Sequence, residues 1–247
     1  LGILSSLNVC SKEWVIRQYD HEVQSGSVLK SLVGPGADGP GDAAVIRPLL
    51  DSDRGLAVSN GINTRYGDYD PYWMAASAID EALRQLVAVG AGLDRVALLD
   101  NFCWGSADDP GNLWALVQAC NACHDMSMAF DTPFISGKDS LNNFAQVEGR
   151  IISVPHTLLI SAMAVMPDVR NVVSMDLKRA GNLLFVVGRT YDELGGSEYC
   201  ACLGSNGGRV PRVRPEVARA SMLALSRATA AGLVRSCHDL SEGGLGV

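Results

Sequence analysis

The sequence lacks any apolar run long enough to cross a bilayer. Its longest apolar runs, within residues 158–165 and 183–187, fall far short of the roughly 18 residues that a membrane helix requires. Residues 1–8 contain no basic region and no clear cleavage site, so they do not resemble a secretory signal. We therefore expect a soluble protein of the cytoplasm with no membrane partner.

Positive charge is also scarce. The formal net charge is -7, with 20 Lys and Arg residues against 27 Asp and Glu residues. Surfaces that bind nucleic acids concentrate lysine and arginine to neutralise phosphates, so we expect no nucleic-acid partner. Any ligand that carries phosphate must then be held by a few local residues.

Cysteine is present, but without the pattern of a disulfide framework. The 7 cysteines are an odd number and are scattered along the chain, which fits reduced thiols. Cys120 and Cys123 form a C-x-x-C pair with His124 beside it, a spacing that also occurs in zinc and redox sites. No metal-ribbon or thioredoxin-like context surrounds the pair, so we favour thiols buried by a helix.

Alternating helix and strand patterns indicate an α/β protein, and a hydrophobic content of 47% is enough for a substantial core. Helices are predicted at 11–24, 71–90, 111–130 and 215–233, with Ala82, Leu83, Leu86 and Val89 facing the core. Strands are predicted at 55–59, 95–99, 134–136 and 182–187. The apolar stretches within 151–165 read as two more strands, separated at Pro155 and His156.

Three segments follow from this pattern. Residues 1–40 read as a helical linker and a mobile Gly-rich loop, and residues 41–168 as a first domain. Residues 169–247 read as the start of a second α/β domain that stops, truncated, after the Gly-rich stretch 241–246.

Small and acidic residues gather in four segments at expected strand ends or turns, where α/β sheets commonly place ligands. The segments are 41–44, 99–101, 136–140 and 238–244. Within the third, Gly137 lets a backbone approach a phosphate, Lys138 supplies positive charge, Asp139 can hold magnesium and Ser140 adds a hydroxyl. A sharp turn with a solvated charge pair fits the same residues, and the Walker A spacing is absent.

Taken in order, the four segments resemble the second half of phosphoribosylformylglycinamidine synthase. Relatives of that family include aminoimidazole ribonucleotide synthetase and selenophosphate synthetase. The resemblance covers nearly the whole chain, with further matches at 11–15, 18–20, 78–90 and 193–199, and Gly-Gly-Ser-Glu-Tyr at 195–199 favours the synthase. It implies an aminoimidazole ribonucleotide synthetase-like first domain, with a mixed sheet covered by helices on one face. Such a sheet closes a barrel when it pairs with an equivalent sheet.

The activity implied by the resemblance is an ATP-dependent ligation. ATP activates the amide oxygen of formylglycinamide ribonucleotide, and ammonia released from glutamine then displaces phosphate. The implied cofactors are ATP and Mg²⁺, and the implied partners are a missing amino-terminal half, a glutaminase domain or subunit, and a second copy in a homodimer. This activity has two alternatives. The chain could be a structural nucleotide-binding half without catalysis, or part of an enzyme similar to selenophosphate synthetase.

Roles for single residues are also implied by the resemblance. It assigns ATP contacts to Asp100 and Gly137 and a substrate contact to Ser140. It also implies an auxiliary nucleotide site, with Glu81 and Asp239 as metal ligands and Ser241 as a nucleotide contact. From their own chemistry we expect Lys138 to contact ATP phosphates and Asp139 to bind magnesium. No catalytic residue falls in this chain, because the family's catalytic histidines lie in the other half; we expect a structural role for His238. At the auxiliary site, Asn60 stands where the family has an Asp ligand and Gln85 stands where it has Asn. The amide of Asn60 in place of a carboxylate removes charge from a hard-cation site.

Overall fold

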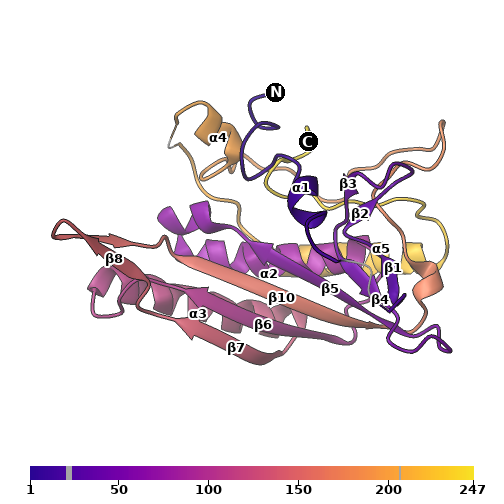
Figure 1. Ribbon diagram of the computed structural model, residues 1–247, viewed down its shortest axis with the longest axis horizontal. Coiled ribbons are helices and arrows are strands. Elements are labelled where there is room, and N and C mark those ends of the chain that lie inside the picture. Colours follow the sequence, from indigo (N-terminus) through magenta and orange to yellow (C-terminus); the bar gives the residue numbers. More distant parts are fainter. Residues whose placement is uncertain (21–23, 206) are drawn as a thin grey trace.

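The computed structural model describes residues 1–20, 24–205 and 207–247. Its centre is a six-stranded mixed sheet in the order β1-β4-β5-β10-β6-β7, with helices on one face (Figure 1). The strands are β1 (Ser27–Leu29), β4 (Ala44–Ile46), β5 (Gly55–Ile62), β10 (Thr157–Met166), β6 (Val96–Cys103) and β7 (Phe134–Ser140). The expected fold class is confirmed. No helix in the described ranges is long and apolar enough to cross a membrane.

Strand β10 is the centre of the sheet. It pairs antiparallel with β5 on one side and with β6 on the other, and β6 pairs parallel with the edge strand β7. Side chains alternate between the two faces of a strand, and those of Leu158, Ile160 and Ala162 are buried on one face. The other face of the sheet is only partly covered. Met163 of β10, which lies on that face, is 38% exposed.

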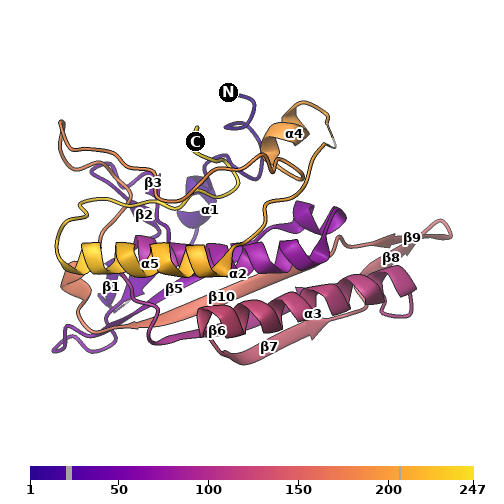
Figure 2. The same ribbon diagram turned by 180° about the vertical axis from the view of Figure 1, so that it is seen from behind.

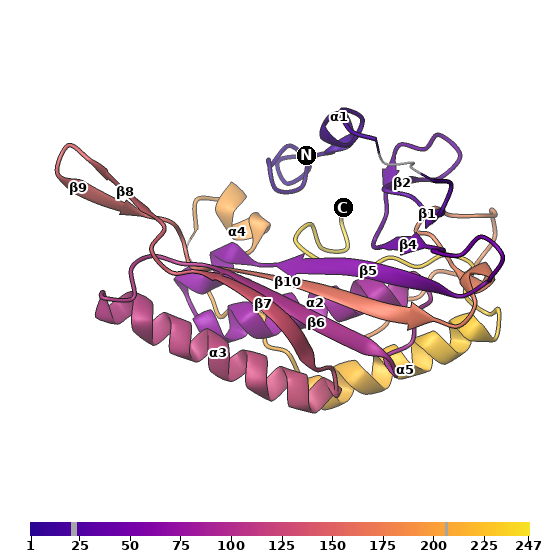
Figure 3. The same cartoon turned by 60° about the horizontal axis from the view of Figure 1, so that its bottom comes forward.

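Three long helices cover the buried face of the sheet (Figures 2 and 3). They are α2 (Pro71–Ala88), α3 (Pro110–Phe130) and α5 (Pro215–Ala230), and each begins with a proline, whose missing N–H costs nothing in the first turn. The carboxylates of Asp70 and Asp109 accept hydrogen bonds from backbone N–H groups and so cap α2 and α3. Helix α2 packs on β5, β10 and α3, and α5 packs against α2 and α3.

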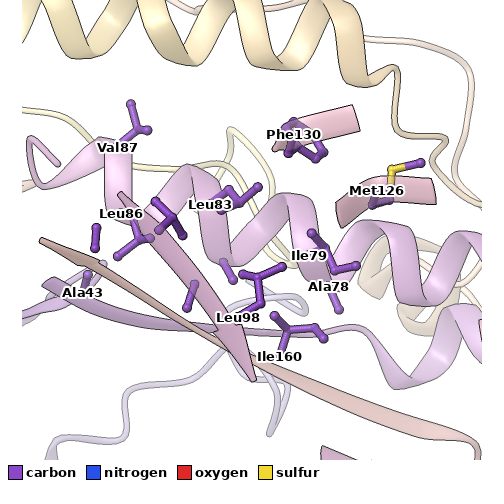
Figure 4. Packing of buried hydrophobic residues seen from close by; sticks show 14 of the residues in the cluster. Ala43, Ala78, Ile79, Leu83, Leu86, Val87, Leu98, Met126, Phe130 and Ile160 are labelled. Carbon is purple, nitrogen blue, oxygen red and sulfur yellow. The ribbon is translucent and has the colours of Figure 1, made fainter. Parts of the chain in front are cut away.

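The core lies between α2 and the sheet (Figure 4). Leu83 and Leu86 of α2 are fully buried, as are Leu98 of β6 and Ile160 of β10. Burying a leucine or isoleucine side chain contributes about 1.5–3 kcal/mol. The prediction that Ala82, Leu83, Leu86 and Val89 face the core is confirmed.

Short elements complete the described chain. The pair β8 (Phe144–Val147) and β9 (Arg150–Ser153) forms a hairpin that projects from the body, as Figure 3 shows. The remaining elements are α1 (Glu13–Ile16), β2 (Leu32–Val33), β3 (Gly39–Pro40), η1 (Thr64–Asp68), η2 (Val169–Asn171) and α4 (Glu198–Cys202).

Two predicted elements differ near the amino terminus. The helix predicted at 11–24 is reduced to Glu13–Ile16, and part of the prediction, residues 21–23, lies outside the described residues. Helix α1 buries none of its residues and has no side-chain cap, so no tertiary packing stabilises more turns. The stretch 25–41, predicted as a mobile loop, instead contains β1, β2 and β3.

The strand predicted at 182–187 is absent from the described chain. Its five apolar residues, 183–187, are all more than half exposed. Neighbouring strands must supply backbone partners before an apolar run becomes a strand, and none in the described part lies alongside it. By contrast, the two strands predicted within 151–165 are confirmed as β9 and β10, although they belong to different sheets.

Candidate functional site

Parallel pairing of β6 with β7 brings Asp100 and the 136–140 motif together. Both strands run further than predicted, so these residues lie inside strands and not in turns. Asp100 is opposite Gly137 and Phe102 is opposite Asp139. Alternation places Asp100, Gly137 and Asp139 on the side of the sheet that the helices cover, where Phe102 is buried.

Lys138 and Ser140 lie on the opposite side of the same strand. Their register partners are Asn101 and Cys103, and the Lys138 Nζ donates a hydrogen bond to the Ser140 Oγ. The motif is therefore divided into an acidic face and a face with a cation and a hydroxyl. Because β7 is an edge strand of the sheet, both faces adjoin the same open edge.

The acidic face has the properties of a cation site. Burial, and then the nearby charge of Asp139, raise the pKa of Asp100. The Asp100 Oδ1 is buried and has no hydrogen-bond partner among the described residues. A Cβ on Gly137 would lie 1.9 Å from that oxygen, so only glycine leaves the space beside it open. Two carboxylates, one of which has an unpaired oxygen, are donors that fit Mg²⁺.

A second group of charged residues lies on α2. Glu81 is buried, and its Oε2 accepts hydrogen bonds from the Ile62 backbone N–H (2.9 Å) and the Asn63 Nδ2 (3.1 Å). Burial raises the pKa of Glu81 to about 7. The guanidinium of Arg84 contacts Asp80 and lies 3.5 Å from the Asp239 Oδ2.

The segment around Asp239 also reaches residues near the amino terminus. His238 Nδ1 lies 2.6 Å from the Asp42 Oδ1, and the Asp239 backbone N–H donates to the same oxygen at 3.1 Å. That hydrogen bond with Asp42 raises the pKa of His238, and burial raises the pKa of Asp239. Two of the four predicted segments, 41–44 and 238–244, therefore meet. Ser241 lies in the second of them and is exposed.

The metal contacts expected at Glu81 and Asp239 stay a prediction. Ligand atoms of Asp42, His238 and Asp239 lie within 4.8 Å of one another and could hold a metal ion. Arg84 already supplies the positive charge between the two acidic elements. The amide oxygen of Gln85 accepts from the Asn60 backbone N–H at 3.4 Å, so this pair makes its own contact. Sequence reasoning missed Arg84, although the Asp80–Arg84 spacing of four residues is typical of an ion pair on a helix.

A pocket of about 490 Å³ lies beside the amino-terminal segment and η1. Its lining includes Lys12, Arg65 and Tyr66, together with Glu198 from the Gly-Gly-Ser-Glu-Tyr stretch. Glu198 accepts hydrogen bonds from Ser6 and Asn8 and forms an ion pair with Arg65 (2.9 Å). None of the residues predicted from the sequence to bind ligands lines this pocket.

The C-x-x-C cysteines lie on α3. Cys123 is buried and Cys120 is exposed, and both are free thiols. Burial raises the pKa of Cys123 to about 12, which keeps it protonated and unreactive.

Comparison with known proteins places the chain in a family. The model of "AIR synthase related protein, N-terminal domain" matches residues 40–165, just over half of the chain. Phosphoribosylformylglycinamidine synthase subunit PurL of Methanocaldococcus jannaschii is 36% identical over 250 residues, which cover 100% of this chain and 33% of that protein. The same subunit of Gloeobacter violaceus is 36% identical over 264 residues, which cover 100% of this chain and 32% of that protein. The chain thus spans about a third of the length of these relatives.

Solved structures share the fold. The structure of PurLQS from Thermotoga maritima superimposes with a TM-score of 0.53 at 23% identity, covering 66% of this chain and 25% of that one. T. maritima PurL complexed with AMPPCP superimposes with a TM-score of 0.51 at 23% identity, covering 68% of this chain and 26% of that one. These likenesses agree with the mixed sheet and its helical layer. The chain belongs to the family of AIR synthase related proteins, and residues 40–165 match the family's N-terminal domain.

Proposed function

We propose that this chain is part of a phosphoribosylformylglycinamidine synthase. The reaction converts formylglycinamide ribonucleotide, glutamine-derived ammonia and ATP to formylglycinamidine ribonucleotide, ADP and phosphate in purine biosynthesis, in the cytoplasm. The observation that carries the proposal is the acidic pair Asp100 and Asp139 beside the space left by Gly137. Synthase subunits that are 36% identical across the whole chain support it.

The chemistry is a phosphoryl transfer followed by a substitution. The substrate's amide oxygen attacks the γ-phosphorus of ATP, ADP leaves, and the amide N–H proton is lost to give an imidoyl phosphate. Ammonia then adds to the imidoyl carbon, phosphate leaves with the oxygen, and the amidine remains. Such reactions depend chiefly on positioning and on electrostatic stabilisation of the transferred group.

Each residue of the β6–β7 site has a proposed role in binding. Asp100 and Asp139 would hold Mg²⁺, which neutralises and orients the phosphates of ATP. Gly137 would let a phosphate approach the backbone. Lys138 would contact the phosphates and Ser140 the substrate, both from the other face of the edge strand. The remaining groups would come from the other half of the synthase and from a glutaminase domain or subunit.

Substitutions at neighbouring positions of β7 separate these roles in the complete enzyme. Asp139→Asn is expected to weaken the Mg²⁺ dependence of activity, because an amide is a poorer ligand for a hard cation than a carboxylate. Lys138→Ala is expected chiefly to raise the KM for ATP, since an ammonium group contacts phosphate and does not ligate a cation. Steady-state rates over a range of Mg²⁺ and ATP concentrations measure both effects. Identical Mg²⁺ titrations for the wild type and Asp139→Asn would reject the assignment.

We also propose that the chain by itself forms a homodimer through the partly covered face of its sheet, opposite the helices. Four apolar side chains on that face remain 37–39% exposed, although each stands in a paired strand: Ile46, Val58, Ile62 and Met163. A second copy would cover them with the same surface, as two-fold symmetry requires.

Light scattering coupled to size exclusion tests this assembly at micromolar concentrations. We expect a mass about twice the 26.2 kDa of the chain. Met163→Lys should shift the protein toward monomer, because it places a charge in the shared apolar face. Val117→Lys is the matched control, since Val117 is 48% exposed on α3, away from that face. A stable monomer for the unsubstituted chain would refute the dimer.

A further inference from the structure

The Arg84 guanidinium lies at the centre of an acidic group built from two distant parts of the chain. Asp80 and Glu81 come from the same helix, and Asp239 comes from the segment that follows α5. Arg84 also donates to the Leu240 carbonyl oxygen at 3.5 Å. The cation therefore joins α2 to the segment 239–240.

Burial distinguishes this group from a surface ion pair. The side chain of Asp239 is 4% exposed and that of Asp80 is 10% exposed. Carboxylates removed from water need a fixed positive partner, and the planar guanidinium provides several N–H donors in a rigid fork. The group is therefore held together by the charge of Arg84.

The carboxylates around Arg84 already face a positive charge, although the Asp239 Oδ2 makes no hydrogen bond within the described residues. Mg²⁺ requires about six oxygen ligands at roughly 2.1 Å. The Glu81 Oε2 accepts hydrogen bonds from Ile62 at the end of β5 and from Asn63. Gln85 is bonded to the backbone of Asn60, and Asp80 and Asp239 face Arg84. Where the family resemblance implies a divalent metal ion, the Arg84 side chain supplies a single positive charge.

We propose that Arg84 is a built-in cation that takes the place of a divalent metal ion at Glu81 and Asp239. It fastens the segment that contains Asp239 to α2 without metal. This inference does not depend on the ligase reaction, since it concerns the cations that this chain binds by itself. Ligand atoms of Asp42, His238 and Asp239 also lie within 4.8 Å of one another, and an ion bound there would likewise depend on Asp239.

Binding of Mn²⁺, followed by electron paramagnetic resonance, tests the proposal on the purified chain. All variants carry Asp139→Asn, so that the β6–β7 site contributes little. We expect this background protein to bind no Mn²⁺ through Asp239. Adding Arg84→Met should create a site for roughly one ion, because the carboxylates lose their internal partner. Adding Asp239→Asn as well should remove that site again.

Two control variants test whether the positive charge of Arg84, and not the loss of any arginine side chain, determines Mn²⁺ binding. Arg227→Met removes an exposed arginine of α5 and should bind no more Mn²⁺ than the background protein. Arg84→Lys keeps the positive charge and should also gain no ion. Arg84→Met should lower the unfolding temperature by about 6 °C or more without metal, and Mn²⁺ should restore part of the loss.

Two results would overturn the proposal. The first is Mn²⁺ binding by the background protein that disappears on Asp239→Asn, because a metal ion would then share the group with Arg84. The second is a folded Arg84→Met variant that gains no Mn²⁺ and loses no stability. If Arg84→Met does not fold, the absence of Asp239-dependent Mn²⁺ binding in the background protein and in Arg84→Lys supports the built-in cation.

Discussion

Replacing Gly61 by alanine is expected to destabilise the chain by about 3 kcal/mol, because β5 and α2 approach too closely for a side chain at this position. A Cβ on Gly61 would lie 2.1 Å from the Ala78 carbonyl oxygen and 3.0 Å from the Ala82 backbone nitrogen. Both atoms belong to the helix backbone and cannot rotate away. The strand and the helix would have to separate, which loosens the core between them.

Urea denaturation followed by circular dichroism measures this effect. Gly246→Ala is the matched control, since nothing lies within 4 Å of a Cβ built there and its backbone is not left-handed. The control should unfold at the wild-type urea concentration, whereas Gly61→Ala should unfold at a clearly lower one. Equal midpoints for the two variants would show that β5 and α2 are further apart than described.

The second large effect is a complete loss of synthase activity in the isolated chain. It spans about a third of its relatives, and catalysis depends on the joint placement of groups that the remaining two thirds would supply. The assay contains ATP, Mg²⁺, formylglycinamide ribonucleotide and ammonium ions, so that no glutaminase is required. We expect no turnover above a protein-free control, and turnover in the same assay by a complete synthase. Product formation by the purified chain alone would contradict the prediction.

The helices could be predicted because their signals are local. α2, α3 and α5 are long amphipathic or Ala-rich runs whose first turn is marked by a proline, and their bounds differ from the predictions by a few residues at most. The predictions that failed concerned elements that need contacts with distant parts of the chain. The helix predicted at 11–24 and the strand predicted at 182–187 have suitable local patterns. Within the described chain, however, only Glu13–Ile16 of the first is helical, with none of these residues buried, and 183–187 has no strand to pair with.

Prediction of the candidate site was limited in a similar way. The composition of 136–140 indicated phosphate and metal chemistry, but reading it as a turn concealed the alternation that places Asp139 and Lys138 on opposite faces. The contact between Asp42 and His238 joins residues at opposite ends of the chain, so no local pattern could reveal it. Arg84 was overlooked because a helical arginine is usually a solvated surface residue.

The central position of β10 has a consequence for the order of folding. Its partners lie much earlier in the chain, with Leu159 opposite Ile62 and Ala162 opposite Leu98. During synthesis, β5 and β6 leave the ribosome long before the strand that must lie between them. Until then α2 has no complete sheet to cover, and its apolar face stays open to chaperones and to premature association. Because this pairing closes long loops, we expect folding of the sheet to be slow and to await completion of β10.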